Sequence, residues 1–366
     1  MTFDRPEAGP ETVFLVRDAL ADLLEIHDVT IGRGNWVQLR GRLLMPADKA
    51  YALASERLRP LGYTPLLRRE GQEDTIRAFP YLFRDSPARN GLAILLLALT
   101  TLSMLFVGAQ RWQWDSPWGA ISSLLSGLPF AGSLLAILGA HELGHYLVSR
   151  RYGVPVSLPY FIPMPFSPFG TMGAVVRMKA PPANRRMLLS IAVAGPLAGL
   201  AVALPLLIVG LKLSTVGPQI IAPGVQIEGN SLLYAAAKFV VFGRWLPGGG
   251  QDVWLHPVAF AAWAGLLVTG LNLTPAGQLD GGHIIYALIG ERARWLTTAV
   301  IVGLILLGVF FWRDWFIWAV LVFAFGWTFA TPLDDITRLD GRGIALAVVM
   351  LVLFALLLTP VPLRMF

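Results

Sequence analysis

Three residues near the end of an apolar segment have the types and spacing of a metal site. In the stretch LLAILGAHELGHYLVSRR, His141 and His145 stand four residues apart, so one helical face would carry both imidazoles about one turn apart. Two imidazoles in this arrangement can chelate one zinc ion. Glu142 lies beside them and could accept the proton of a water that the zinc activates. A lone histidine in a membrane helix would most simply form a hydrogen bond to a neighbouring helix. Three polar residues within five positions at hydrocarbon depth cost much more free energy, which indicates a function.

The third protein ligand that a catalytic zinc usually takes must come from elsewhere in the chain. Acidic residues within apolar segments are few, and Asp280 stands out at the end of one, in LVTGLNLTPAGQLDGGHIIYALIG. Pro275 and Gly277 break the helix there and expose backbone groups beside the carboxylate. Asp280 could instead cap the helix that follows, over His283–Ile289. The unfilled zinc site in the same half of the bilayer favours ligation over capping.

Two separated motifs resemble those of a known family. HELGH and NLTPAGQLDG, which spans Asn272 to Gly281, resemble the paired signatures HExxH and NxxPxxxxDG of the site-2 proteases, intramembrane zinc metalloproteases. The Gly195-Pro196 pair in the intervening apolar segment is similar to that family's central helix. The chain leaves no room for a PDZ domain between these segments, which is more like the branch that includes the chloroplast gravitropism-linked proteases and their bacterial relatives.

The resemblance implies a site with three parts. One Zn²⁺ ion would be bound by His141, His145 and Asp280, and Glu142 would be the catalytic acid and base. Asn272 would stand near the reacting carbonyl and could donate a hydrogen bond to the tetrahedral oxyanion. The alternative for Asn272 is an interhelical hydrogen bond, which is a common use of asparagine in helix bundles.

Composition indicates where these residues sit. The chain has 366 residues, of which 55% are hydrophobic and 14% are charged, and residues 1–90 hold 13 of the 29 basic and 13 of the 23 acidic residues. The charge distribution predicts a charged head followed by a membrane unit. Basic residues in short loops between apolar segments are typical of membrane proteins, so the high pI does not indicate a nucleic-acid partner. The absence of cysteine excludes disulfides and thiolate zinc ligands.

The apolar segments predict a polytopic α-helical membrane protein with about seven transmembrane helices, since each approaches the ~20 residues that cross a bilayer. They cover residues 91–109, 121–148, 187–211, 258–273, 296–311, 315–331 and 344–358. The proline-rich segment Val154–Met178 is too broken for a spanning helix and would be a surface loop or a re-entrant segment. Within it, Gly170–Lys179 could form a hairpin whose edge adds an unwound substrate as a strand, or an ordinary interfacial strand pair.

Residues 1–90 predict a small N-terminal α+β soluble domain of unknown role. The expected helices cover 11–26 and 46–58, and the expected strands cover 29–31, 36–44, 63–69 and 74–79. Beyond this domain we expect the first transmembrane helix and an external loop over 91–118, the catalytic core over 119–290, and additional C-terminal transmembrane helices over 291–366.

Loop charges predict the orientation. Residues 149–186 hold six basic residues and no acidic ones, which favours a cytoplasmic loop. The N-terminal domain would then be cytoplasmic, and the active site would open to the cytoplasm, as the resemblance also implies. We expect an integral membrane protein of the bacterial plasma membrane.

Three functional hypotheses follow. The favoured one is an intramembrane zinc endopeptidase that cleaves single-span transmembrane proteins. The second is a metal-binding transporter that uses His141, His145 and Asp280 as a transit site, and it has no need for Glu142. The third is a catalytically silent scaffold of the same fold. The sequence leaves the oligomeric state open.

Overall fold

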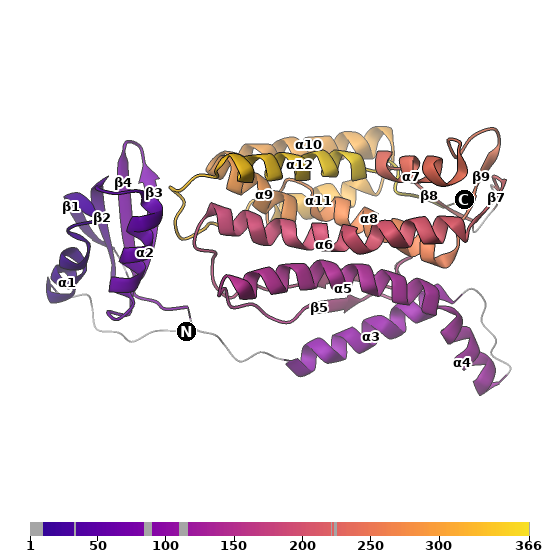
Figure 1. Ribbon diagram of the computed structural model, residues 1–366, viewed down its shortest axis with the longest axis horizontal. Helices are drawn as coiled ribbons and strands as arrows, with labels where there is room; N and C mark the ends of the chain where they lie inside the picture. Colours follow the sequence, from indigo (N-terminus) through magenta and orange to yellow (C-terminus); the bar gives the residue numbers. More distant parts are fainter. Residues whose placement is uncertain are drawn as a thin grey trace.

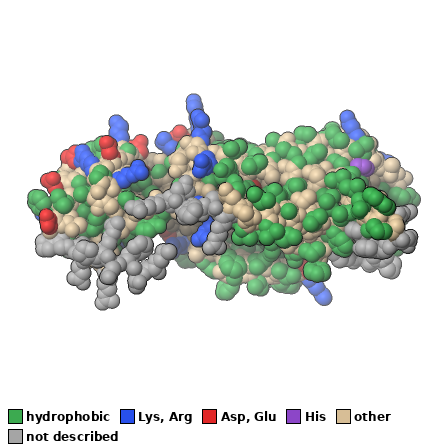
Figure 2. All heavy atoms as spheres, turned by 90° about the horizontal axis from the view of Figure 1, so that it is seen from below, with side chains coloured by type: hydrophobic (Ala, Val, Ile, Leu, Met, Phe, Trp, Pro, Cys, Tyr) green, Lys and Arg blue, Asp and Glu red, His purple; other side chains and the backbone are tan. Residues whose placement is uncertain are grey.

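The chain folds into a small head and a longer unit of helices, which lie one after the other along the molecule (Figure 1). The computed structural model describes residues 10–32, 34–83, 90–109, 116–220, 222 and 225–365. Charged side chains gather on the head, whereas hydrophobic side chains cover most of the visible face of the helical unit (Figure 2). The uneven charge distribution of the sequence therefore corresponds to two parts of the structure.

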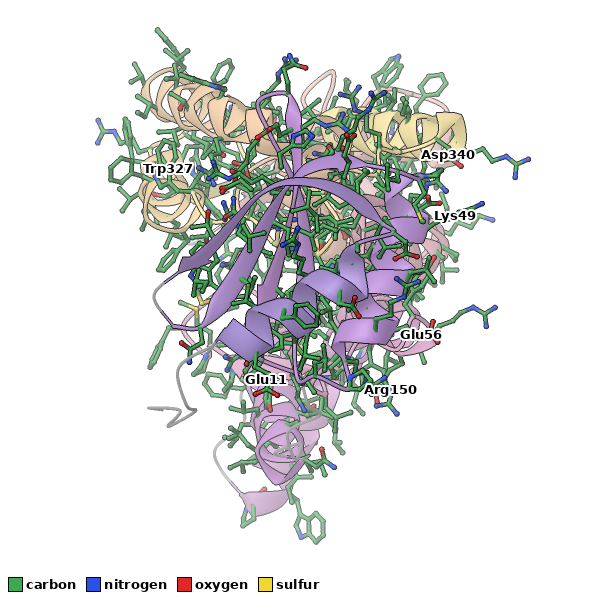
Figure 3. The ribbon with its side chains drawn as sticks, turned by 90° about the vertical axis from the view of Figure 1, so that its left-hand side faces the viewer. Glu11, Lys49, Glu56, Arg150, Trp327 and Asp340 are labelled. Atoms are coloured by element: carbon green, nitrogen blue, oxygen red, sulfur yellow. The ribbon has the colours of Figure 1, made fainter. Side chains whose placement is uncertain are left out.

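The head is a four-stranded antiparallel sheet in the order β1-β2-β4-β3, and two helices share its core. Seen end-on, the sheet stands in front of the helical unit, with Glu11 on α1 and Glu56 on α2 (Figure 3). Leucines from both helices and from the sheet are fully buried together, which gives the head a core of its own. Its elements are α1 (Pro10–Leu20), β1 (Leu24–Gly32), β2 (Trp36–Leu43), α2 (Ala47–Leu58), β3 (Thr64–Glu70) and β4 (Glu73–Phe79).

One expected element of the head is wrong in its second half. The helix predicted over 11–26 ends at Leu20, and strand β1 already begins at Leu24. Residues 24–26 pair with the end of β2, in the register Leu24↔Leu43 and Ile26↔Gly41. Cross-strand pairing therefore overrides the local helical pattern, as tertiary context often does.

The helical unit contains the elements that position the candidate site. Helices α5, α6, α8 and α9 contact one another and lie side by side in Figure 1. The helices are α3 (Asn90–Gly108), α4 (Pro117–Ser126), α5 (Leu128–Arg151), α6 (Arg185–Lys212), α7 (Leu232–Phe242), α8 (Pro257–Asn272), α9 (Asp280–Ile289), η1 (Gly290–Arg292), α10 (Ala293–Phe310), α11 (Trp315–Phe325) and α12 (Gly341–Leu357). The strands are β5 (Tyr160–Pro163), β6 (Thr171–Val175), β7 (Thr215–Pro218), β8 (Gln226–Glu228), β9 (Gln251–Trp254) and β10 (Leu363–Met365).

The helices support a membrane protein but leave the number of crossings open. Among the described residues, three stretches are long and apolar enough to cross a bilayer: α3, α6 and the continuous segment Asp280–Phe310. A fourth results if α4 and α5 count as one span, bent by 45° at Gly127. The other apolar helices, α7, α8, α11 and α12, are shorter, so seven crossings stay a prediction.

The proline-rich segment forms a β-hairpin packed within the helical unit. Strands β5 and β6 pair antiparallel, with Tyr160 opposite Val175. Gly170, at the turn between them, has φ +71°, and a Cβ there would lie 2.7 Å from the Cα of Met104 on α3. The tip of the hairpin thus contacts the backbone of α3 closely, a contact that only glycine permits. The segment is not a helix, in agreement with the sequence.

Candidate metal centre

Helix α5 brings the two histidines of the HELGH motif onto one face. The Nε2 atoms of His141 and His145 lie 3.2 Å apart, and the two rings meet edge to face at 70°. Both side chains belong to a single uninterrupted helix, so their spacing is set by the helical repeat. Two ring nitrogens therefore point to one place, as the sequence predicts.

Asp280 reaches the same place from the start of α9. Its Oδ2 lies 3.2 Å from His141 Nε2, and its Oδ1 lies 3.3 Å from His145 Nε2. The N-cap position of α9 is Leu279, and no side chain caps this helix. Asp280 is thus the first residue of α9 rather than its cap, and its carboxylate is directed to the imidazoles. The capping alternative does not describe this structure.

The donor set fits a zinc ion. Ligands at about 2.0–2.1 Å around a tetrahedral zinc stand about 3.3 Å from one another. The separations here, 3.2, 3.2 and 3.3 Å, agree with that spacing. The Nδ1–H of His145 donates to the carbonyl oxygen of Ile191 at 2.8 Å, which leaves the Nε2 lone pair free for a metal. Among the described residues these three form the one group of His, Asp and Glu side chains close enough to hold an ion.

Two glycines of α6 make room for the imidazoles. A Cβ at Gly195 would lie 2.0 Å from His145 Nε2, and a Cβ at Gly199 would lie 3.3 Å from His141 Nδ1. Two small residues four positions apart on a helix usually permit close packing of another helix. In the structure the pair faces the candidate ligands themselves, so α6 forms one wall of the site.

Glu142 lines the same cavity, whose volume is about 180 Å³. Its side chain is buried, and Val176, directly after β6, lines the same cavity. Asn272, at the end of α8, places its Nδ2 at 3.4 Å from His141 Nε2. All five residues predicted from the sequence are therefore brought together, and their chemical roles stay predictions.

Two other acidic residues of the apolar part lie away from this cavity. Glu228 and Asp252 flank the fully buried Lys238, at 3.7 and 3.5 Å from its Nζ. Burial raises the pKa of the Glu228 carboxyl, and the Lys238 ammonium opposes that rise. This cluster ties β8, α7 and β9 together at the end of the helical unit opposite the head (Figure 1).

Sequence reasoning missed a backbone group of the site. The carbonyl of Ile191 orients His145, but a backbone group carries no residue-type signal. The only available hint was that ligand histidines usually donate their second ring N–H to a fixed acceptor.

Fold and site are those of a membrane unit built around a metal centre, and comparison with known proteins agrees. The family described as Peptidase family M50 matches residues 129–311, which is half of the chain. The chain belongs to this family, the site-2 proteases. The resemblance that the two motifs indicate is thereby confirmed.

Curated relatives carry the names of zinc metalloproteases. The chain is 34% identical to "Probable zinc metalloprotease EGY2, chloroplastic" of Arabidopsis thaliana over 268 residues, which are 73% of this chain and 48% of the relative. It is 33% identical to "Probable zinc metalloprotease EGY1, chloroplastic" of the same plant over 247 residues, 64% of this chain and 43% of the relative. No solved structure matches the chain.

The chain spans about half the length of the curated relatives it matches. These relatives are chloroplast proteins by name, so the bacterial plasma membrane stays a prediction, as does the orientation. Family and apolar helices together indicate an integral membrane protein.

Proposed function

We propose that the protein is an intramembrane zinc endopeptidase that hydrolyses peptide bonds of transmembrane proteins. The observation that carries the proposal is the convergence of His141, His145 and Asp280 within 4.8 Å, with Glu142 on the wall of the same cavity. Family membership supports the reaction class, and the names of the relatives support zinc.

The residues of the chain divide the work of hydrolysis. When bound, zinc would supply Lewis-acid activation of water and of the scissile carbonyl. Glu142 takes a proton from the attacking water and returns it to the leaving amine. Glu142 is buried and lines the same cavity as the proposed ligands. The Asn272 amide can donate a hydrogen bond to the oxyanion.

Strand β6 supports a mode of substrate binding. A helical substrate has its peptide bonds satisfied by its own hydrogen bonds, so it must unwind before cleavage. Ala174, Val175 and Val176 line the cavity together with the candidate ligands, and β6 is paired with β5. An unwound segment that adds to this edge would present its backbone to Glu142.

Glu142 separates the proposal from its alternatives. A transporter that moves a metal past the two histidines and Asp280 does not require a buried glutamate between its ligands. A silent scaffold requires no proton acceptor at all. A buried Glu142 on the wall of the cavity that contains the proposed ligands favours hydrolysis over both.

Metal removal tests the proposed function. The full chain in proteoliposomes, together with tagged single-span proteins, should cleave at least one of them. A zinc chelator should abolish cleavage, and added Zn²⁺ should restore it, because the ligands alone lack a Lewis acid. The readout is the appearance of tagged fragments on gels. Cleavage that continues in metal-free protein, or no cleavage of a broad panel by zinc-loaded protein, would contradict the proposal.

A second prediction concerns the amide of α8. Asn272→Ala should lower kcat about a hundredfold, because removing one oxyanion donor typically costs about that much. The zinc content of the purified protein should stay unchanged, since Asn272 is not among the proposed ligands. Gln278→Ala is the matched control, because the Gln278 side chain is also an amide that lines this cavity. Its Nε2 donates a hydrogen bond to Thr328 Oγ1. Equal losses in both variants would argue against an oxyanion role.

A further inference from the structure

The segment of residues 333–335, between α11 and α12, joins the head to the helical unit. The N–H of Leu67 on β3 donates to the carbonyl oxygen of Leu333 at 2.9 Å, and the N–H of Asp335 donates back to the carbonyl oxygen of Leu67 at 3.2 Å. Arg68 adds a side-chain hydrogen bond to the same Leu333 oxygen. The side chain of Ile336, directly after the segment, packs against the core of the head.

The same segment is hydrogen-bonded to the chain before α6. The N–H of Leu333 donates to the carbonyl oxygen of Pro182 at 2.9 Å, and the N–H of Asp334 donates to that of Ala183 at 2.7 Å. Asn184 then caps α6 by accepting a hydrogen bond from the N–H of Met187. Segment 333–335 thus forms a backbone connection between β3 of the head and the first turn of α6.

The side chain of Asp335 extends this connection to α9. Its Oδ1 accepts a hydrogen bond from Arg185 Nε on α6 at 2.8 Å, and its Oδ2 accepts one from the Tyr286 hydroxyl on α9 at 3.1 Å. The Asp335 and Arg185 side chains are 9% and 13% exposed, so the pair is largely shielded from water. One residue therefore binds the head with its backbone and two helices of the site with its carboxylate.

Both of these helices position candidate ligands. Tyr286 lies six residues after Asp280 on the short helix α9, about 9 Å along its axis, so a shift at Tyr286 moves Asp280 with it. Helix α6 begins at Arg185 and carries the Ile191 carbonyl that orients His145. Ligand positions must hold to within a fraction of an ångström for tight binding and turnover.

We propose that the head sets the position of Asp280 through Asp335, which links strand β3 to Tyr286 on α9 and to Arg185 on α6. Asp335 and Tyr286 are positioning residues, because neither touches the proposed zinc or substrate. A head docked on segment 333–335 keeps the ligands assembled, and a head that is displaced releases α9. Whatever binds the head and competes with this docking would lower the zinc affinity of a cavity that it never touches.

This inference rests on the proposed zinc site, and zinc affinity tests it independently of cleavage. The zinc Kd of the full chain in nanodiscs is measured by competition with a chromophoric chelator. Asp335→Asn, Tyr286→Phe and the undocking variant Ile336→Asp should each raise the Kd about tenfold, the lower range for residues that orient ligands. Because they act along one path, Tyr286→Phe combined with Ile336→Asp should give less than the product of the single effects.

Two control variants isolate the path from the head. The single hydroxyl hydrogen of Tyr286 is shared between Asp335 and Glu291, whose Oε1 lies 3.2 Å from the hydroxyl oxygen, so Glu291→Gln alters the same hydroxyl without touching the head. Asp22→Asn removes an ion pair with Arg57 on the head that is not part of segment 333–335. Both should leave the zinc Kd within about twofold of the wild type, because the Asp22 and Glu291 side chains are 60% and 57% exposed.

Hydrogen exchange of residues 280–289 gives a second measurement that needs no activity. Ile336→Asp should increase exchange in α9 while the sheet of the head stays protected. The inference is overturned if α9 exchange and zinc Kd stay at wild-type values in Ile336→Asp, or if Glu291→Gln and Asp335→Asn have equal effects. If the wild type binds zinc and couples to the head as stated but cleaves nothing, the proposed function fails and the coupling stands.

Discussion

Glu142→Gln should lower peptide hydrolysis about a thousandfold or more, because it removes the group that takes and returns the proton. Glutamine has nearly the same shape as glutamate, so it occupies the same space in the cavity. The two histidines and Asp280 are unchanged, so the zinc content of the purified variant should match that of the wild type. Fragment formation in proteoliposomes and zinc per chain are the two measurements.

Comparison with Glu142→Asp and with metal uptake makes this result specific. Aspartate keeps the carboxylate but withdraws it by one methylene, so it should retain part of the activity that glutamine loses. The transporter hypothesis does not require Glu142. If the wild type takes up metal into vesicles, Glu142→Gln should therefore leave that uptake unchanged. Undiminished cleavage by Glu142→Gln would remove Glu142 from the reaction, and loss of zinc would show that it supports the metal instead.

The side chains proposed for the chemistry could be predicted from the sequence for two reasons. Three of them are close together in the sequence, and polar or charged residues in an apolar segment cost free energy unless they have a function. His141, Glu142 and His145 share one helix, so their spacing alone places them, and Asp280 stood out as an acidic residue at the end of an apolar segment. The structure places the four together and also places Asn272 beside them. The backbone contribution of Ile191 has no such signal, since any residue type offers a carbonyl.

The fold was less accessible where distant segments meet. The sequence predicts the bounds of β2, β3 and β4 to within a residue or two. It predicts helix for residues 24–26 at the start of β1, because the pairing of β1 with β2 leaves no signal in the local sequence pattern. The isolated β-bridge between Leu67 and Asp334 joins residues far apart in the chain, and no hydrophobic periodicity in the sequence predicts it. The sequence indicates no function for the head for this reason, because its hydrogen bonds to the helical unit run through residues 333–335, which have the pattern of an ordinary loop.

Gly195→Ala should abolish zinc binding and with it hydrolysis. The added methyl group would lie 2.0 Å from His145 Nε2 and 2.5 Å from the adjacent ring carbons, well inside any allowed contact. Moving the His145 ring away from the methyl group would cost free energy, because it would break the hydrogen bond from Nδ1–H to the Ile191 carbonyl. We expect zinc affinity to fall more than about a hundredfold, beyond the usual range for residues that merely orient ligands.

Other glycines of α5 and α6 provide a graded comparison for this prediction. At Gly199 the added methyl would lie 3.3 Å from His141, a tight contact that a few tenths of an ångström relieve, so Gly199→Ala should cost about tenfold or less in zinc affinity. At Gly132 and Gly139 a Cβ would meet nothing within 4 Å, and alanine there should leave zinc binding unchanged. An ordering in which Gly195→Ala binds zinc as well as Gly139→Ala would mean that α6 does not approach the histidines as closely as the site requires. Competition with the chromophoric chelator measures the zinc Kd of these glycine variants and of the variants between the head and α9. The effect of the α6 wall and the effect of the position of Asp280 can therefore be compared as changes in zinc Kd.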